Sequence, residues 1–158
     1  MARPREVPGF DCDEPFAAAA ARVIGARGGE VFEHSGGVLD IEVIKHLHDM
    51  RVATRRLRAA MEVFEACFPR KRFRKRLKEV KALADALGAR RDRDVEIEFL
   101  TEFAAEAPEA DRAALGEMIE GLRREQREAN DALAPHLDEE SLDRLRRRLE
   151  KLVRKART

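Results

Sequence analysis

The chain has 158 residues, of which 44% are apolar and 40% are charged, and it contains no tryptophan or tyrosine. This length suffices for one domain with a hydrophobic core, and the alanine-, leucine-, arginine- and glutamate-rich composition indicates long helices. No apolar run approaches the roughly 20 residues of a membrane span, and the N-terminal stretch lacks the apolar segment of a signal peptide. Cys12 and Cys67 are isolated and match neither a disulfide framework nor a CxxC motif. We therefore expect a soluble cytoplasmic protein without membrane association.

The net charge of +1 conceals a strong local asymmetry. Residues 45–93 hold 16 basic and 6 acidic residues, a net of +10, whereas the remainder holds 16 basic and 25 acidic residues, a net of −9. Since the local charge sets the field that a ligand meets, the central block matters more than the sum. The sequence therefore places one basic segment between two acidic flanks.

The N-terminal part predicts a flexible arm followed by two helices. Residues 1–13 contain prolines and a glycine and are expected to form the arm, ahead of one helical domain over residues 14–158. Asp13 is a candidate N-cap for a first helix through the alanine-rich stretch, which Gly36-Gly37 should end. Asp40 is the expected N-cap of a second helix, which should run to about Phe68 before Pro69 stops it.

Two further helices are expected in the middle of the chain. A third helix over about 70–87 is indicated by five apolar residues at helical spacing: Phe73, Leu77, Val80, Ala84 and Leu87. Gly88 fits the position just past its end. A fourth helix over about 92–106 should turn four apolar residues inward: Val95, Phe99, Leu100 and Phe103.

The C-terminal part predicts two more helices. Pro108 opens a fifth helix that should reach about Leu133, where Pro135 breaks it. Asp138 caps a sixth helix, whose apolar stripe comprises Leu142, Leu145, Leu149 and Leu152. No stretch alternates with a period of two for long enough to form a strand. The sequence therefore predicts an all-α fold, an antiparallel bundle of about five to six helices.

The second helix carries a row of cations in the run HLHDMRVATRRLR (46–58). Successive residues of a helix lie about 100° apart, so one stripe beside the apolar face holds four of these side chains: His48, Arg51, Arg55 and Arg58. Arg56 points elsewhere. The only acids nearby are Asp49, on another face, and Glu62. Because arginine offers a planar fork that binds phosphate bidentately, the stripe suits a polymer with repeated negative charge.

The expected third helix adds eight more cations: Arg70, Lys71, Arg72, Arg74, Lys75, Arg76, Lys78 and Lys81. Pro69 should place the second and third helices side by side and antiparallel. We therefore expect the basic faces of the two helices to line one groove.

The run from His48 to Arg58, H-x-x-R-V-A-T-R-R-L-R, resembles the signature helix of the CHAD family of histidine-bearing helical domains. LGARRDRDV (87–95) is similar to that family's L-G-x-x-R-D-x-D-V turn. The resemblance covers about residues 14–106 and is weak beyond them. It implies a helical domain that binds inorganic polyphosphate without catalysis or a cofactor, that associates with polyphosphate granules, and that frequently accompanies triphosphate-hydrolysing tunnel domains.

The resemblance also implies which side chains bind polyphosphate. On the second helix the family's binding positions fall on His48, Arg51, Arg55, Arg56 and Arg58. On the third helix the corresponding companions are Arg72, Lys75, Arg76, Lys78 and Lys81. Arg91 and Asp92 match the turn, where Asp92 is alternatively the cap of the fourth helix.

The chain departs from the family in one respect. Members usually contain two related helical halves whose basic helices face each other across a channel, whereas this sequence has one H-x-x-R-V-x-x-R-R-L-R helix. Two interpretations stay open: a half-length member with a degenerate second half, or a homodimer in which a second copy supplies the missing basic helix.

Three other functional classes are alternatives to polyphosphate binding. A metal-dependent hydrolase is disfavoured because Glu96 and Glu98 lack the lysine of an E-x-E-x-K motif, position 100 being Leu100, and because the two glutamates would point about 200° apart on a helix. A dedicated nucleic-acid binder is disfavoured because no tryptophan or tyrosine is available for base stacking. An accessory or scaffold role beside a triphosphate-processing enzyme is compatible with polyphosphate binding.

Overall fold

The computed structural model describes residues 3–9, 11 and 13–156, so Cys12 lies outside the described part. Over these residues the chain forms five α-helices, a short 3-10 helix and no strand. The elements are α1 (Phe16–Glu33), α2 (Ile44–Val63), η1 (Glu65–Cys67), α3 (Arg70–Glu106), α4 (Glu109–Leu137) and α5 (Glu139–Val153). The predicted all-α antiparallel bundle is confirmed.

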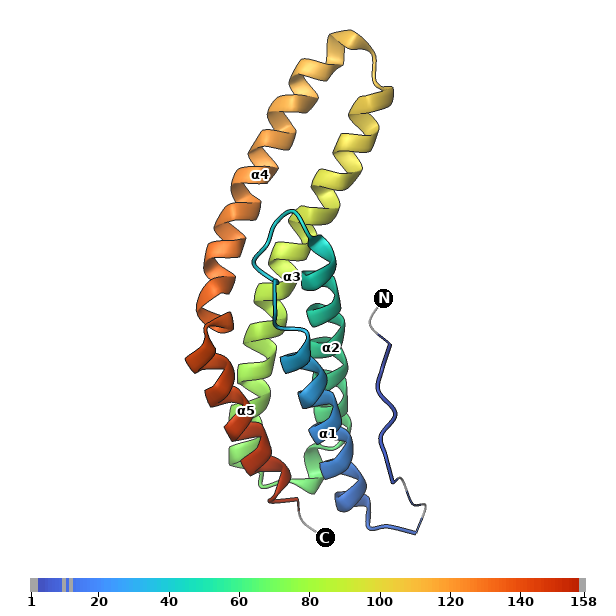
Figure 1. Ribbon diagram of the computed structural model, residues 1–158, viewed down its shortest axis with the longest axis vertical. Helices are drawn as coiled ribbons and strands as arrows, with labels where there is room; N and C mark the ends of the chain where they lie inside the picture. Colours follow the sequence, from blue (N-terminus) through green and yellow to red (C-terminus); the bar gives the residue numbers. More distant parts are fainter. Residues whose placement is uncertain (1–2, 10, 12, 157–158) are drawn as a thin grey trace.

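The helices form an elongated molecule with a compact end and a projecting arm (Figure 1). α1 and α2 run antiparallel, and α3 passes both of them and continues beyond the loop that joins them. The second half of α3 and the first half of α4 make a two-helix arm at the far end, and α5 continues the course of α4, after a bend, along α1 and toward the start of α3. The cations of α2 and of early α3 therefore belong to the compact end.

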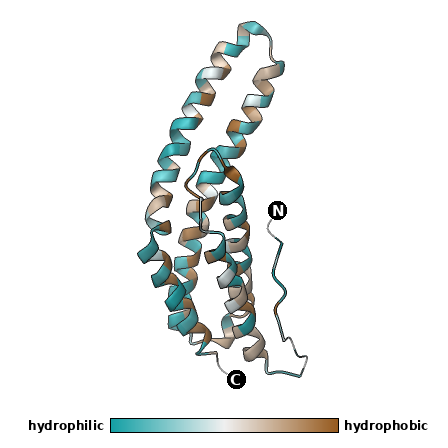
Figure 2. Ribbon diagram, in the orientation of Figure 1, coloured by the Kyte–Doolittle hydropathy of each residue, from teal (hydrophilic) through white to brown (hydrophobic). Residues whose placement is uncertain are grey.

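One apolar cluster holds the compact end together. From α2 it takes the side chains predicted for the buried face, among them Leu47, Met50, Ala53, Leu57 and Met61, each at most 1% exposed. The predicted seam of α3 is confirmed for Phe73, Leu77, Val80 and Leu87, which are at most 9% exposed, and is wrong for the half-buried Ala84. Leu149 and Leu152 of α5 complete the cluster, whereas α5 presents mainly hydrophilic residues outward (Figure 2).

The third and fourth predicted helices are one helix. Gly88 lies inside α3 rather than past its end, because an interior glycine costs only about 1 kcal/mol and its neighbours favour helix. Asp92 is therefore not a cap. The inward direction predicted for three residues is also wrong, since a pair of helices such as the arm encloses little: Val95, Phe99 and Phe103 are 45%, 63% and 56% exposed.

The expected break at Pro135 does not occur. Pro135 lies within α4, which ends at Leu137, so the missing N–H group of this proline affects only the last turn. The next predicted cap is confirmed, since the Asp138 side chain accepts a hydrogen bond from the Ser141 N–H group at 2.8 Å.

The starts of the first two helices also differ from the prediction. α1 begins at Phe16, directly after Pro15, and the side chain of Asp13 does not cap it. α2 begins at Ile44 because the Asp40 carboxylate instead accepts a hydrogen bond from the Glu42 N–H group at 2.9 Å, within a turn. Such local bonds compete with helix formation and delay the first helical turn.

Replacing Gly88 with alanine tests the continuity of α3. No atom lies within 4 Å of a Cβ built at Gly88, whereas one built at Gly37, whose φ is +72°, would lie 3.0 Å from His46. We expect Gly88→Ala to raise the free energy of unfolding by about 0.5–1 kcal/mol in thermal or urea denaturation, and Gly37→Ala to lower it. A destabilised Gly88→Ala variant would show that the helix ends where the sequence suggested.

Candidate functional site

Three arginines of α2 line a groove against α3. The groove, with a volume of about 440 Å³, is lined by Arg51, Arg55 and Arg58 from α2 and by Ala84, Asp85, Gly88, Ala89 and Asp92 from α3. We call it the α2/α3 groove. The stripe forms because the apolar residues of α2 face the core and leave this row of side chains at its edge. The small residues of α3 keep the floor open.

The arginines of the α2/α3 groove differ in how far carboxylates neutralise them. Among the residues that the structure describes, Arg51 and Arg55 make no ion pair or side-chain hydrogen bond. Arg58 instead donates from Nε to Glu62 at 3.1 Å, and Lys81 reaches the same carboxylate at 3.1 Å. These two bonds lower the pKa of Glu62. Glu62, one of the two nearby acids in the sequence, therefore neutralises Arg58 but forms no ion pair with Arg51 or Arg55.

Two carboxylates of α3 also line the groove, which the sequence of α2 alone could not show. Asp85 and Asp92 face the arginines from the opposite wall. No ion pair joins either of them to Arg51 or Arg55 within the described chain. The groove is thus basic on the α2 wall and mixed on the α3 wall.

His48 is the stripe residue nearest the N-terminus of α2, and it is half-buried and close to Arg91 of α3. Burial lowers the pKa of His48 and the nearby positive charge of Arg91 lowers it further, while Asp49 opposes the shift. The Nη1 group of Arg91 is buried and has no hydrogen-bond partner. His48 is therefore held toward its neutral form next to a guanidinium with an unused donor.

The remaining predicted residues do not share this groove. Arg56 is not among the residues that line it. A second groove, the α3/α5 groove, is instead lined by three residues of the predicted set, Arg72, Lys75 and Arg76. Lys71 of early α3 lines it as well. Lys78 lines neither groove, and Lys81 turns toward α2. The predicted single groove is therefore wrong, because α3 turns its basic residues to two sides.

The sequence reasoning missed a buried polar cluster that joins α3 to α4. Arg90 is fully buried and forms an ion pair with Asp94, which also accepts a hydrogen bond from Gln126 of α4 at 2.7 Å. The spacing in the sequence could have indicated that these side chains are buried, since Arg90 and Asp94 continue the row of Leu83 and Leu87 on the core face of α3. A buried pair of this kind fixes the helix that carries Arg91.

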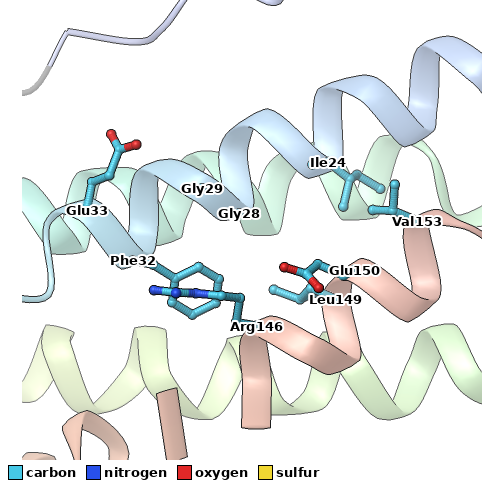
Figure 3. Close-up of a pocket in the computed structure, with 10 residues that line it drawn as sticks. Ile24, Gly28, Gly29, Phe32, Glu33, Arg146, Leu149, Glu150 and Val153 are labelled. Atoms are coloured by element: carbon cyan, nitrogen blue, oxygen red, sulfur yellow. The ribbon is translucent and has the colours of Figure 1, made fainter. Parts of the chain in front are cut away.

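A third concave surface lies between α1 and α5, away from the arginines of α2 (Figure 3). Gly25, Gly28 and Gly29 leave one wall without side chains, and the guanidinium of Arg146 lies 4.8 Å from the ring centre of Phe32. Its volume is about 390 Å³. A Cβ at Gly28 would lie 3.7 Å from Leu149, which is an ordinary van der Waals contact, so the approach of α5 to α1 does not itself require glycine there.

The described residues contain no group of three or more histidine, cysteine, aspartate or glutamate side chains placed to hold a metal ion. In the same part of the chain, no helix has the length and apolar character to cross a membrane. Cys67 is a free thiol inside the core, and burial raises its pKa.

Comparison with protein families gives one match. The family model described as the CHAD domain matches residues 22–158. The matched region begins within α1 and extends through α5, beyond the segment that carries the sequence resemblance. Comparison with curated proteins finds no match for the chain.

Removing Asp94 tests the buried cluster. We expect Asp94→Ala to lower the free energy of unfolding by about 3 kcal/mol or more, because the charge of Arg90 would stay buried without a partner. The double variant Arg90→Met with Asp94→Leu should lose less than Asp94→Ala alone, since both charges are then absent. Urea denaturation of the three proteins decides this, and a loss below about 1 kcal/mol for Asp94→Ala would contradict the burial of the pair.

The pKa of His48 provides a second test. In the free protein an NMR titration should give a pKa below the ordinary value of 6.5, and Arg91→Ala should raise it. As pH falls below 6.5, the unfolded chain takes up this proton before the folded one, so the His48 contribution should lower the free energy of unfolding until pH falls below the folded pKa. A pKa at or above 6.5 would contradict this account.

Proposed function

This chain belongs to the CHAD family, and on that premise we propose that it binds inorganic polyphosphate through the α2/α3 groove and its flanking His48 and Arg91, without a catalytic step of its own. The observation that carries the proposal is the row of Arg51 and Arg55. Their guanidinium groups lie one helical turn apart on the groove wall and make no ion pair with the described residues. Like charges at this spacing repel each other, so an anion there would stabilise the pair.

The geometry of the groove favours a linear anion. The cations follow the axis of α2, so that successive phosphates of an extended chain can meet successive turns. Each guanidinium can hold two phosphate oxygens through its fork, which a lysine cannot do. Ala84, Gly88 and Ala89 leave room for the chain to lie between the helices. The carboxylates of Asp85 and Asp92 repel phosphate, which favours a path along the α2 wall.

His48 adds a proton-dependent contribution. In the free protein its pKa is lowered by burial and by Arg91, so the imidazole is neutral at neutral pH. A phosphate bound between His48 and Arg91 would raise that pKa, since a nearby negative charge favours the imidazolium. Binding is then coupled to proton uptake, and affinity increases as pH falls toward the His48 pKa.

The proposal includes a role for a second copy of the chain. A twofold dimer would set a second histidine-bearing helix across from the first and lengthen the surface available to a polymer. An enzyme that forms or cleaves phosphoanhydride bonds is a natural partner for such a binding domain, because the domain would hold its substrate nearby.

Charge reversal at Arg51 and Arg55 tests the site. Arg51→Glu with Arg55→Glu should weaken the binding of long-chain polyphosphate at least about 100-fold, since each charge-assisted hydrogen bond contributes about 1.5–3 kcal/mol. Arg55→Lys should weaken it less, because the charge stays and the fork is lost. The dissociation constants come from fluorescence or calorimetric titration, with circular dichroism showing unchanged helicity.

The matched control makes the same change in net charge at two arginines outside both grooves. Arg124 and Arg127 are exposed on α4 and line neither groove, so Arg124→Glu with Arg127→Glu should bind almost as the parent does. Equal losses in the two double variants would mean that net charge alone governs binding and that the α2/α3 groove is not the site.

A further inference from the structure

The α3/α5 groove is a concave surface lined almost entirely by basic residues. Besides the four cations of early α3 named above, it is lined by Arg148 and Lys151 of α5 and by Lys155 just after that helix, with Leu152 as its apolar element. Its volume is about 520 Å³, and no carboxylate lines it. The α2/α3 groove, by contrast, contains two aspartates.

Few of these cations have a protein partner. Arg76 and Arg148 share the carboxylate of Glu79, at 3.1 Å and 2.8 Å. Within the described residues, no ion pair is formed by the other five cations: Lys71, Arg72, Lys75, Lys151 and Lys155. The groove therefore holds several positive charges that one carboxylate at its edge cannot balance.

Helix stability does not explain this concentration of charge. The lysines at the end of α5 are favourable there, because a helix C-terminus attracts cations. α3 begins at Arg70 in the same region, and its first turn has no acidic residue. Cations at a helix N-terminus oppose the helix dipole and are unfavourable there. An anion in the groove would meet both the cations and the positive end of α3.

The two grooves are separate surfaces on opposite sides of the exposed face of α3. They share no lining residue. With about 100° per residue, Arg72 and Gly88 point about 160° apart around the axis of α3. The ion pairs of Glu62 with Arg58 and Lys81 join α2 to α3 on the α2 side of that helix. A short anion can therefore occupy only one groove at a time.

The lining of the α3/α5 groove selects the kind of anion. Phe68 and Phe73, the nearest aromatic residues in sequence, are 3% and 0% exposed, so no ring is available for stacking a nucleobase. Leu152 is 3% exposed, so no apolar side chain can enter a lipid layer. What remains accessible is ammonium and guanidinium groups, which match a bare phosphate chain.

We propose that the α3/α5 groove is a second, independent binding site for condensed phosphate. This inference rests on the proposed function of the α2/α3 groove for the identity of the anion, but not for its location. A long chain bound in one groove can continue around the outside of α3, past Lys78, into the other. Two sites on one helix would favour long polymers over short ones by raising the effective concentration of the second segment.

The test is calorimetric titration of the full chain with tripolyphosphate and with long-chain polyphosphate. The parent should bind two tripolyphosphates. Lys75→Glu with Lys151→Glu should bind one, and should bind long chains about tenfold more weakly with a smaller salt dependence. Arg51→Glu with Arg55→Glu should also bind one, and the variant with all four changes should bind none.

The outcomes separate this inference from the proposed function. If the Lys75/Lys151 variant keeps the parent stoichiometry, or loses no more affinity than the Arg124/Arg127 control, the second site is wrong and the first stands. If the Arg51/Arg55 variant keeps both sites while the Lys75/Lys151 variant loses one, the proposed α2/α3 site is wrong and the α3/α5 site stands. Displacement of tripolyphosphate from the Arg51/Arg55 variant by single-stranded DNA or anionic vesicles, at equal phosphate concentration, would overturn the choice of ligand.

Discussion

The packing of α2 against α3 determines where every cation of the candidate site lies. Leu47, Met50 and Leu57 of α2 enter the same core as Phe73 and Val80 of α3. Once these apolar faces meet, neither helix can rotate without exposing them, and burial of such side chains stabilises by about 1.5–3 kcal/mol each. The guanidinium groups of α2 are thereby presented along a fixed edge, so that little ordering is required when an anion binds.

The charges of the chain are also sorted along its length. Residues 95–125, which form most of the arm, hold 9 acidic and 3 basic residues, a net of −6. The two basic grooves belong to the other half of the molecule, and the buried Arg90–Asp94–Gln126 cluster lies where the arm joins it. A polyanion approaching the arm is repelled and one approaching the compact end is attracted. The nearly neutral total charge hides this directional field.

The sequence predicted the fold class, the buried face of α2, most of the buried face in the first half of α3 and the stripe on α2, because these depend on local periodicity. It misplaced Gly88 and Pro135, since tertiary packing and neighbouring helix formers outweigh a single unfavourable residue. The division of the α3 cations between two grooves could not be predicted without the position of α5, which brings Lys151 to one side of α3. Gln126 was missed for the same reason, since only the long-range pairing of α3 with α4 gives it a partner.

The central claim is that fixed rows of unpaired cations recognise a linear phosphate polymer. Titration of the chain with polyphosphates of graded length, at two salt concentrations and with ATP and duplex DNA as competitors, tests this claim most directly. The account predicts that affinity rises with chain length and falls steeply with salt, and that neither competitor displaces long polyphosphate at equal phosphate concentration. Affinity that does not depend on chain length, or displacement by DNA at that concentration, would contradict it.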